Sequence, residues 1–312
     1  MENFWIAAGA VLPLMIYMGI GLLAKKRYGF TSQIISYFNK LVFGVFLPTN
    51  MFYSVYFTDM SKVVKPAFVG FTVAGLLVEY LVGFALVMAL VKDNRKRGAM
   101  IQAFYRSNFI LLGVPLVENL YGPEATALPL MLVAIVVPLY NVLAVFTLET
   151  FRGGTFNPVK ILWGVLKNPM ILGALGGLLC KFLPFPLPAA LLKCLKAIAA
   201  STTPFSLIVL GASFTLQGAV SELKELVFTV FGRLVLAPAI VLGAAIYVGI
   251  RGLELASIMA YTATPCAVAS FAMAQQMDSD GELAGNCVIF SSALSCLTMF
   301  LWVFAFKNLG LL

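Results

Sequence analysis

Apolar residues run through this chain in long blocks rather than in short alternating stretches. About 20 apolar residues in a helix cross the hydrocarbon layer of a bilayer. Blocks of that kind predict spans at 4–24, 33–57, 66–91, 99–120, 126–148, 168–183, 188–216, 226–250, 255–277 and 283–306. Only helices or closed barrels satisfy their backbone in lipid, and the alternating segments of a barrel are missing from the sequence. The pattern therefore predicts an all-α membrane protein with ten transmembrane helices.

The composition agrees with this class of protein. Hydrophobic residues make up 61% of the chain and charged residues 11%, whereas a soluble domain carries about 25% charged residues. The net charge of +8 comes from short basic clusters between the apolar blocks, where the positive-inside rule expects them. The lipid bilayer is thus the expected surrounding, and nucleic acid is not an expected partner.

Residues for catalysis or metal binding are scarce in the sequence. The chain has no histidine, and its five cysteines show no C-x-x-C spacing. Its aspartates fall in predicted loops or at span ends, so neither a zinc site nor a Ser-His or paired-aspartate centre can be assembled. We expect no enzyme activity, no metal and no cofactor, and the sequence leaves open whether H⁺ or Na⁺ drives a coupled process.

Lysine and arginine gather in the loops after the first, third and fifth predicted spans, as in Lys25, Lys26 and Arg27. Such loops are expected on the cytoplasmic side of the membrane. An even number of spans then places both termini outside the cytoplasm, in a multi-pass protein of the cell membrane.

The two halves of the chain follow the same plan. We interpret residues 1–312 as a single membrane domain in which 1–150 and 158–307 are repeats of five spans each. The second span of each half contains a proline, Pro48 in one and Pro204 in the other. Because five is an odd number, the second copy runs through the membrane upside down, which is the inverted-repeat plan of many secondary transporters.

Proline also falls inside the fourth span of each half, at Pro115 and Pro265. A proline removes a helical hydrogen bond and clashes with the carbonyl four residues earlier, so we expect these two residues to break their helices. A matched pair of broken spans indicates a binding site near the bilayer midplane. The alternative is that each proline merely kinks a packed helix.

Several short motifs lie in a familiar order. They are Asn39-Lys40-Leu41-Val42 with Pro48, Asn108-x4-Gly113-Val114-Pro115-Leu116, and Thr264-Pro265 through Phe271-Ala272 to Val288-Ile289-Phe290. In this order they resemble the auxin efflux carrier family, the PIN-like proteins of the bile, arsenite and riboflavin-type transporter superfamily. The sequence lacks the long loop that PIN proteins carry between spans 5 and 6, so it is more similar to a compact microbial member.

The resemblance implies a ten-span fold in which broken helices 4 and 9 cross. It implies a scaffold of spans 1, 2, 6 and 7, a moving unit of the remaining spans, and an elevator-type alternating-access mechanism. It also implies transport of small organic anions, either auxin-like acids or carboxylates such as malate and malonate, by a homodimer joined through the scaffold.

Candidate substrate-binding residues cluster around the two expected breaks. They are Asn108, Arg106, Gly113, Pro115, Thr264, Pro265 and Cys266. Asn108 is the first choice, because it matches the crossover motif and offers a carboxylate a neutral donor. An asparagine that only bonds to a neighbouring helix is the alternative. Arg106 is interpreted either as an attractor of anions or as a side chain that snorkels to the interface.

Glu79 lies deep in the third predicted span, where a charge is costly. With no histidine in the chain, it is the candidate proton carrier for coupled transport. The equally weighted alternative is a structural ion pair with Arg233, in the third span of the other repeat, or with Arg106.

A transporter of small organic anions is the favoured function. The alternative is a transporter-like membrane sensor that binds a small ligand at the same broken helices without net transport.

Overall fold

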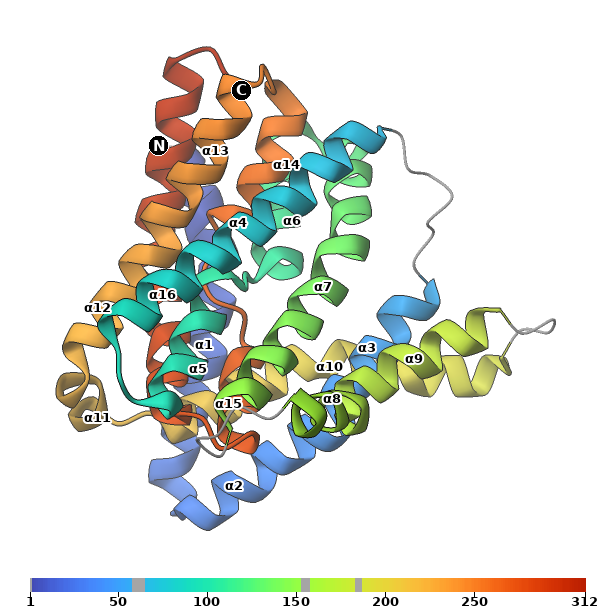
Figure 1. Ribbon diagram of the computed structural model, residues 1–312, viewed down its shortest axis with the longest axis vertical. Coiled ribbons are helices and arrows are strands. Elements are labelled where there is room, and N and C mark those ends of the chain that lie inside the picture. The colour runs from blue at the N-terminus through green and yellow to red at the C-terminus, as the bar shows by residue number, and fades with distance from the viewer. Residues whose placement is uncertain (1, 58–64, 153–157, 183–186) are drawn as a thin grey trace.

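The computed structural model describes residues 2–57, 65–152, 158–182 and 187–312. Every regular element in these ranges is helical, and the one pairing of extended residues is an isolated bridge between Ser107 and Cys266 (Figure 1). The prediction of an all-α protein is therefore confirmed for the described part of the chain.

The structure contains these α-helices in chain order: α1 (Glu2–Tyr28), α2 (Ser32–Leu41), α3 (Leu47–Phe57), α4 (Pro66–Leu90), α5 (Asn94–Tyr105), α6 (Val114–Tyr121), α7 (Ala127–Phe151), α8 (Pro158–Lys167), α9 (Pro169–Lys181), α10 (Ala189–Ser213), α11 (Leu216–Ser221), α12 (Leu223–Phe231), α13 (Ala237–Tyr247), α14 (Gly252–Thr262), α15 (Ala269–Gln276) and α16 (Gly281–Asn308). Short turns join some of them: η1 (Val42–Phe46), η3 (Phe109–Gly113) and η5 (Gly232–Leu236) are π-helical, and η4 (Pro123–Thr126) is a 3-10 turn.

Five continuous helices in the described residues are long and apolar enough to cross a membrane. They are Pro66–Leu90, Pro123–Phe151, Ala189–Ser213, Leu223–Tyr247 and Gly281–Asn308, and the bent pair Ile161–Lys167 and Pro169–Lys181 raises the number to six if it forms one span. This pair bends by 57°, so α8 and α9 are separate helices on the two sides of the bend. The full ten-span layout goes beyond these findings and remains a prediction.

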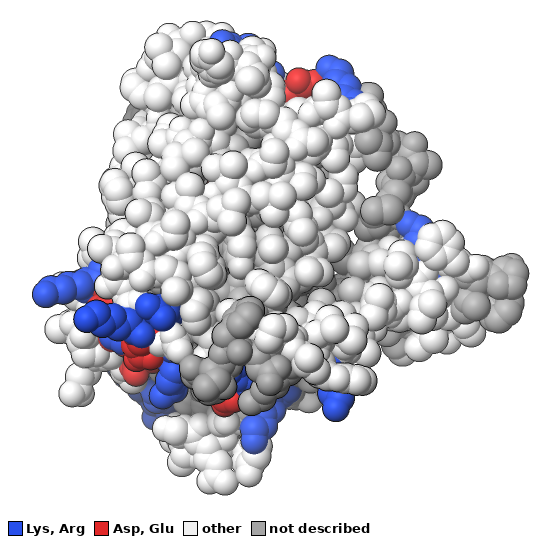
Figure 2. Space-filling view, in the orientation of Figure 1, with Lys and Arg blue, Asp and Glu red and all other residues white. Residues whose placement is uncertain are grey.

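On the face shown in Figure 2, a broad and largely uncharged region covers the middle of the molecule. Most charged side chains on the face in Figure 2 lie near its lower end, and a few lie at the upper end. Both chain ends lie at the top of Figure 1. An uncharged belt between charged ends is the surface that a bilayer-spanning helical protein presents to lipid.

Each π-helical turn is followed by a proline two residues later, at Pro48, Pro115 and Pro238. Proline has no N–H and crowds the carbonyl four residues before it. A π turn admits one extra residue and thereby relieves this crowding without ending the helix. The prolines thus bend these helices rather than break them.

The first expected break lies earlier than predicted. Helix α5 ends at Tyr105 and helical structure resumes at Phe109, so Pro115 sits inside the helix that follows the break. The prediction that Pro115 makes the break is wrong, because the π turn η3 accommodates it. Pro265 does lie within the second break, between α14 and α15.

Helices α1, α3, α9 and α10 pack against one another through close backbone contacts. Helix α3 packs on α9, and α1 packs on α10 and also on α16. Glycine permits the α1–α10 contact, since a Cβ atom at Gly211 would lie 1.9 Å from the carbonyl oxygen of Met18. Figure 1 shows α3 and α9 projecting together to one side of the remaining helices.

Candidate functional site

Two broken helices cross near the centre of the molecule. The extended residues between α5 and η3 pair in antiparallel fashion with those between α14 and α15, with Ser107 opposite Cys266. The Asn108 N–H donates to the Pro265 carbonyl at 2.8 Å, and the Ala267 N–H donates to the Arg106 carbonyl at 3.2 Å. These bonds satisfy backbone groups that would otherwise be unpaired in a membrane interior.

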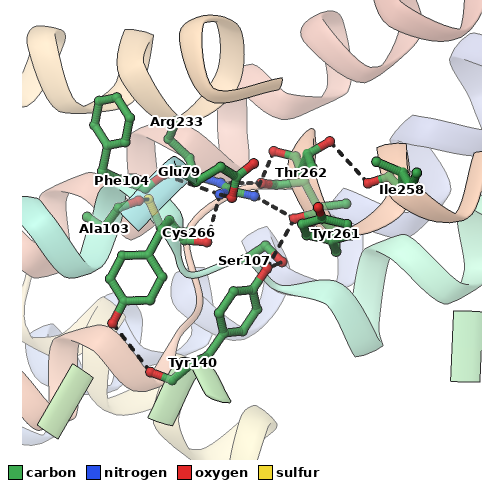
Figure 3. Close-up of polar contacts among 12 residues, drawn as sticks. Glu79, Ala103, Phe104, Ser107, Tyr140, Arg233, Ile258, Tyr261, Thr262 and Cys266 are labelled. Atoms are coloured by element: carbon green, nitrogen blue, oxygen red, sulfur yellow. Dashed lines mark hydrogen bonds and ion pairs between the residues drawn. The ribbon is translucent and has the colours of Figure 1, made fainter. Parts of the chain in front are cut away.

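Arg233, in η5, holds the ends of both broken helices (Figure 3). Its Nε donates to the Thr264 carbonyl at 2.9 Å. Its Nη atoms donate to the carbonyls of Phe104 (3.3 Å), Tyr105 (2.9 Å), Tyr261 (2.7 Å) and Thr262 (2.7 Å). The last carbonyls of a helix lack intrahelical partners and carry partial negative charge. One guanidinium therefore caps α5 and α14 together.

Glu79, in α4, supplies the counter-charge to Arg233. Its carboxylate lies 3.6 Å from Nη1 of Arg233, and both side chains are fully buried. This is one of the two arrangements that the sequence left open, and no ion pair joins Glu79 to Arg106 in the described residues. Whether Glu79 also carries protons stays a prediction.

A cavity of about 1070 Å³ lies beside the crossover. The two extended strands contribute Arg106, Ser107, Asn108 and Ala267 to its wall. Most of the other lining residues are apolar, and the polar ones on the surrounding helices are Tyr17, Asn50, Tyr53, Asn119, Tyr140, Asn141, Lys196, Thr202, Thr203 and Ser206. No Asp or Glu is among the described residues that line it.

Asn108 and Arg106 lie buried in the cavity wall with unused donors. Asn108 is 8% exposed, and its Nδ2 has no hydrogen-bond partner among the described residues. Arg106 is 2% exposed, and its Nε likewise has no partner there. A buried polar group without a partner is costly, so a hydrogen-bond acceptor beside either of these two donors would be favourable.

Neutral groups hold the Arg106 guanidinium in place. Nη2 donates to Oδ1 of Asn141 at 2.7 Å, and Nη1 contacts Oε1 of Gln102 at 3.2 Å and Sδ of Met273 at 3.0 Å. No Asp or Glu in the described part of the chain pairs with it. The cavity wall therefore carries a buried positive charge that the protein itself does not neutralise.

The positive ends of two helices reinforce this charge. Phe109, which begins the helix over 109–121, and Ala269, which begins α15, both line the cavity. Helix N-termini present unpaired N–H groups and partial positive charge. Arg233 covers the negative ends of the other two half-helices, α5 and α14, so the crossover presents Arg106 and two helix N-termini to the cavity.

The remaining candidate residues divide between the cavity and the helix crossing. Pro115 lines the cavity, whereas Gly113, Thr264 and Cys266 do not. A Cβ atom at Gly113 would lie 2.3 Å from the Ala260 carbonyl oxygen, so this glycine permits close packing on α14.

The residues of the second break position the crossover instead of lining the cavity. The Thr264 hydroxyl donates to the Ala260 carbonyl at 3.0 Å, and the Cys266 thiol donates to the Ala103 carbonyl at 3.2 Å. The Pro265 carbonyl accepts the bond from Asn108.

Sequence reasoning missed three polar residues of the cavity. Asn141 orients Arg106, Tyr140 shares a 3.0 Å hydrogen bond with Ser107, and Lys196 adds a second cationic side chain to the lining. Asn141 and Lys196 both lie inside predicted apolar spans, and a polar residue in such a span is the sequence signal that could have identified them as candidates.

Comparison with known proteins identifies the family of this chain. A family described as "Membrane transport protein" matches residues 6–155 and 156–303. The chain is 22% identical over 303 residues to an "Uncharacterized transporter" of Methanothermobacter thermautotrophicus, covering 94% of this chain and 96% of that protein. It is also 22% identical over 299 residues to a "Putative malonate transporter" of Rhizobium meliloti, covering 93% of each. With nearly its whole length matched, the chain belongs to this family of membrane transport proteins.

Proposed function

We propose that this protein carries small carboxylates across the cell membrane, with the substrate bound in the cavity at the crossover. The observation that supports this most directly is the buried Arg106, which has no acidic partner in the described residues and lies beside Asn108. A charge left uncompensated inside a membrane protein costs about 2.5–3.5 kcal/mol on insertion scales. An anionic substrate removes that cost.

A carboxylate suits these donors. The planar guanidinium matches the two oxygens of a carboxylate, and such charge-assisted bonds are the strong ones. Asn108 adds a neutral donor that binds the same group without a second buried charge.

The cavity accommodates mono- and dicarboxylates such as auxin-like acids, malate and malonate. At about 1070 Å³ it lies at the upper end of the range of ligand pockets, roughly 300–1000 Å³. The Rhizobium relative carries malonate in its name, which makes malonate the first probe. A sensor that only binds the ligand has the same site, so flux across a membrane separates the two functions.

Our proposal includes the ten-span inverted-repeat layout and an elevator movement. Helices α1, α2, α3, α9 and α10 would form the scaffold, and the crossover would move with α4–α7 and α12–α16. The contacts of α3 with α9 and of α1 with α10 support such a scaffold. A homodimer through this scaffold, termini outside the cytoplasm, and the identity of any coupling ion belong to the same proposal.

Thermal unfolding of the purified protein against a panel of carboxylates tests the site. A ligand at 100 times its dissociation constant adds about 2.7 kcal/mol to the folded state, so malonate or another acid of the panel raises the melting temperature of the wild type. We expect Asn108→Ala to lose most of this shift. The matched control is Asn308→Ala, at the exposed end of α16, which keeps the full shift.

The outcomes separate site and function. An acid that stabilises wild type and Asn108→Ala equally would leave the transport class standing but place the substrate elsewhere. Stabilisation by neutral solutes or cations alone, with none of the carboxylates active, would contradict the proposed substrate class.

A further inference from the structure

We propose that this protein is an anion exchanger, in which the crossover site passes through the membrane only while it holds an anion. This inference rests on the proposed function and adds to it how transport is driven. It follows from the charge that the empty site carries.

The two buried arginines of the crossover differ in how they are neutralised. Arg233 has Glu79 at 3.6 Å and five backbone carbonyls around its guanidinium. Arg106 has only the neutral acceptors Gln102, Asn141 and Met273. At the crossover the empty site therefore keeps the full positive charge of Arg106, to which the two helix N-termini add partial charge, whereas the second cation of the lining, Lys196, lies on α10 of the proposed scaffold.

The Arg106 charge is fixed to the crossover. Its three partners come from α5, α7 and α15, all of which belong to the proposed moving unit together with the broken helices. With 2% of its surface exposed, the side chain does not reach water by snorkelling, as long cationic side chains near helix ends do. Any movement of the crossover carries this charge along.

The cavity offers no acid that could neutralise Arg106 while the site is empty. None of the described lining residues is an aspartate or glutamate, and Glu79 already forms an ion pair with Arg233. A carboxylate substrate supplies the missing negative charge. The second carboxylate of a dianion such as malonate is balanced by the two helix N-termini, each equivalent to about half a positive charge.

The loaded site is thus close to neutral, and the empty site is strongly positive. Moving an unpaired charge through a region of low dielectric is unfavourable. The empty site therefore returns slowly, whereas a site loaded on either side crosses readily. Such a carrier exchanges one anion for another instead of moving anions in one direction.

Uptake into proteoliposomes tests this inference with the full-length protein. Vesicles contain either unlabelled malonate or only the potassium salt of a bulky zwitterionic sulfonate buffer, which replaces chloride so that no small anion is inside, and labelled malonate is added outside at a clamped membrane potential. We expect initial uptake into malonate-loaded vesicles to be at least about tenfold faster than into the buffer-filled vesicles, because the return of the empty site carries an uncompensated charge. Equal uptake into both would overturn the exchange mechanism while leaving carboxylate transport in place.

Two substitutions assign the effect to Arg106. Arg106→Gln removes the charge, and Asn141→Asp places a permanent counter-charge where Oδ1 now accepts the 2.7 Å bond. Both are expected to lower the ratio of exchange to net uptake towards one, even where total uptake falls. The ratio of exchange to net uptake does not depend on the amount of folded protein, so a lower yield of either variant does not change it. If Arg106→Gln fails to fold, the ratio measured with Asn141→Asp tests the assignment.

The control is Arg95→Gln, an exposed arginine of the same helix α5, which leaves the ratio at the wild-type value. A ratio that stays high in both Arg106→Gln and Asn141→Asp would show that another group enforces exchange and would overturn the assignment. Absence of malonate uptake in both vesicle types, together with absence of a melting shift, would contradict the proposed function itself.

Discussion

At the residue scale, Arg233 shows how a membrane protein tolerates a buried charge. Five carbonyl oxygens and the Glu79 carboxylate surround its guanidinium. Arginine suits this position because it offers five donors in a rigid planar fork. Lysine has three donors on one nitrogen and does not reach both helix ends in this way.

Arg233→Gln is therefore expected to destabilise the protein strongly. The substitution leaves Glu79 as an unpaired buried charge and removes the cap from α5 and α14, and breaking a buried ion pair costs about 3–5 kcal/mol. Unfolding in a graded denaturing detergent measures this loss. The second substitution Glu79→Gln, made on top of Arg233→Gln, should restore part of the stability because it removes the orphaned charge.

The control for this prediction is Arg251→Gln. Arg251 also donates to backbone carbonyls, that of Ile246 in the last turn of α13 and that of Ile250 just beyond this helix, but it is exposed. Its loss should cost no more than about 0.5 kcal/mol, as at most surface positions. Similar losses at Arg233 and Arg251 would contradict the proposed double cap.

Sequence reasoning named two residues that line the cavity, Asn108 and Arg106, but not the contacts that hold the site together. Asn108 stood out because it matches the crossover motif, and Arg106 because charges are rare in apolar spans. Sequence reasoning did not predict that Arg233 donates to the carbonyls of Tyr105 and Thr262. Tyr105 lies more than a hundred residues before Arg233 in the sequence. Such pairings follow from the tertiary fold, which residue spacing does not reveal.

At the element scale, the crossing of η3 over α14 depends on a glycine. A Cβ atom at Gly113 would lie 2.3 Å from the carbonyl oxygen and 2.9 Å from the carbonyl carbon of Ala260. Both atoms belong to the backbone of α14, so they cannot move aside as a flexible side chain would. The close approach in turn keeps Phe109, at the start of the same turn, beside the cavity.

Gly113→Ala should therefore lower stability by about 1–3 kcal/mol, the usual cost of overpacking a filled site. The matched control is Gly243→Ala in α13, where nothing lies within 4 Å of the added Cβ. There the substitution should be neutral or stabilise by about 0.5–1 kcal/mol, since alanine favours helix. Melting temperatures of both variants check the pair, and equal effects would argue against the close crossing.

The positions of the helix breaks were only partly predictable. Proline marked both broken spans, yet α5 ends at Tyr105, ahead of Pro115. Either a π turn or a full break of the helix can accommodate a proline, so the local sequence does not predict which of the two forms. The choice is made by partners far along the chain, namely the pairing of Ser107 with Cys266 and the Arg233 cap.

At the scale of the whole molecule, two side-chain contacts join the proposed scaffold to the proposed moving unit. Asn39 of α2 donates to Gln275 of α15, and Asn168 donates to Sδ of Met277 at 3.5 Å. Gln275 lies six residues beyond Ala269 of the cavity wall, about 9 Å along the helix. In an alternating-access cycle these contacts separate when the site opens to the other side.

Tethering α2 to α15 should therefore stop transport without preventing binding. Asn39→Cys and Gln275→Cys, combined with Cys180→Ser and Cys194→Ser, place two thiols at this contact for a short bis-maleimide linker. Cross-linked protein is expected to lose malonate uptake in proteoliposomes and to keep its melting shift with malonate, because the cavity lies elsewhere. Each single-cysteine variant treated with the same reagent should retain uptake. Full uptake by the cross-linked pair would show that α2 and α15 stay together during the cycle, which contradicts an elevator movement with this division of the helices.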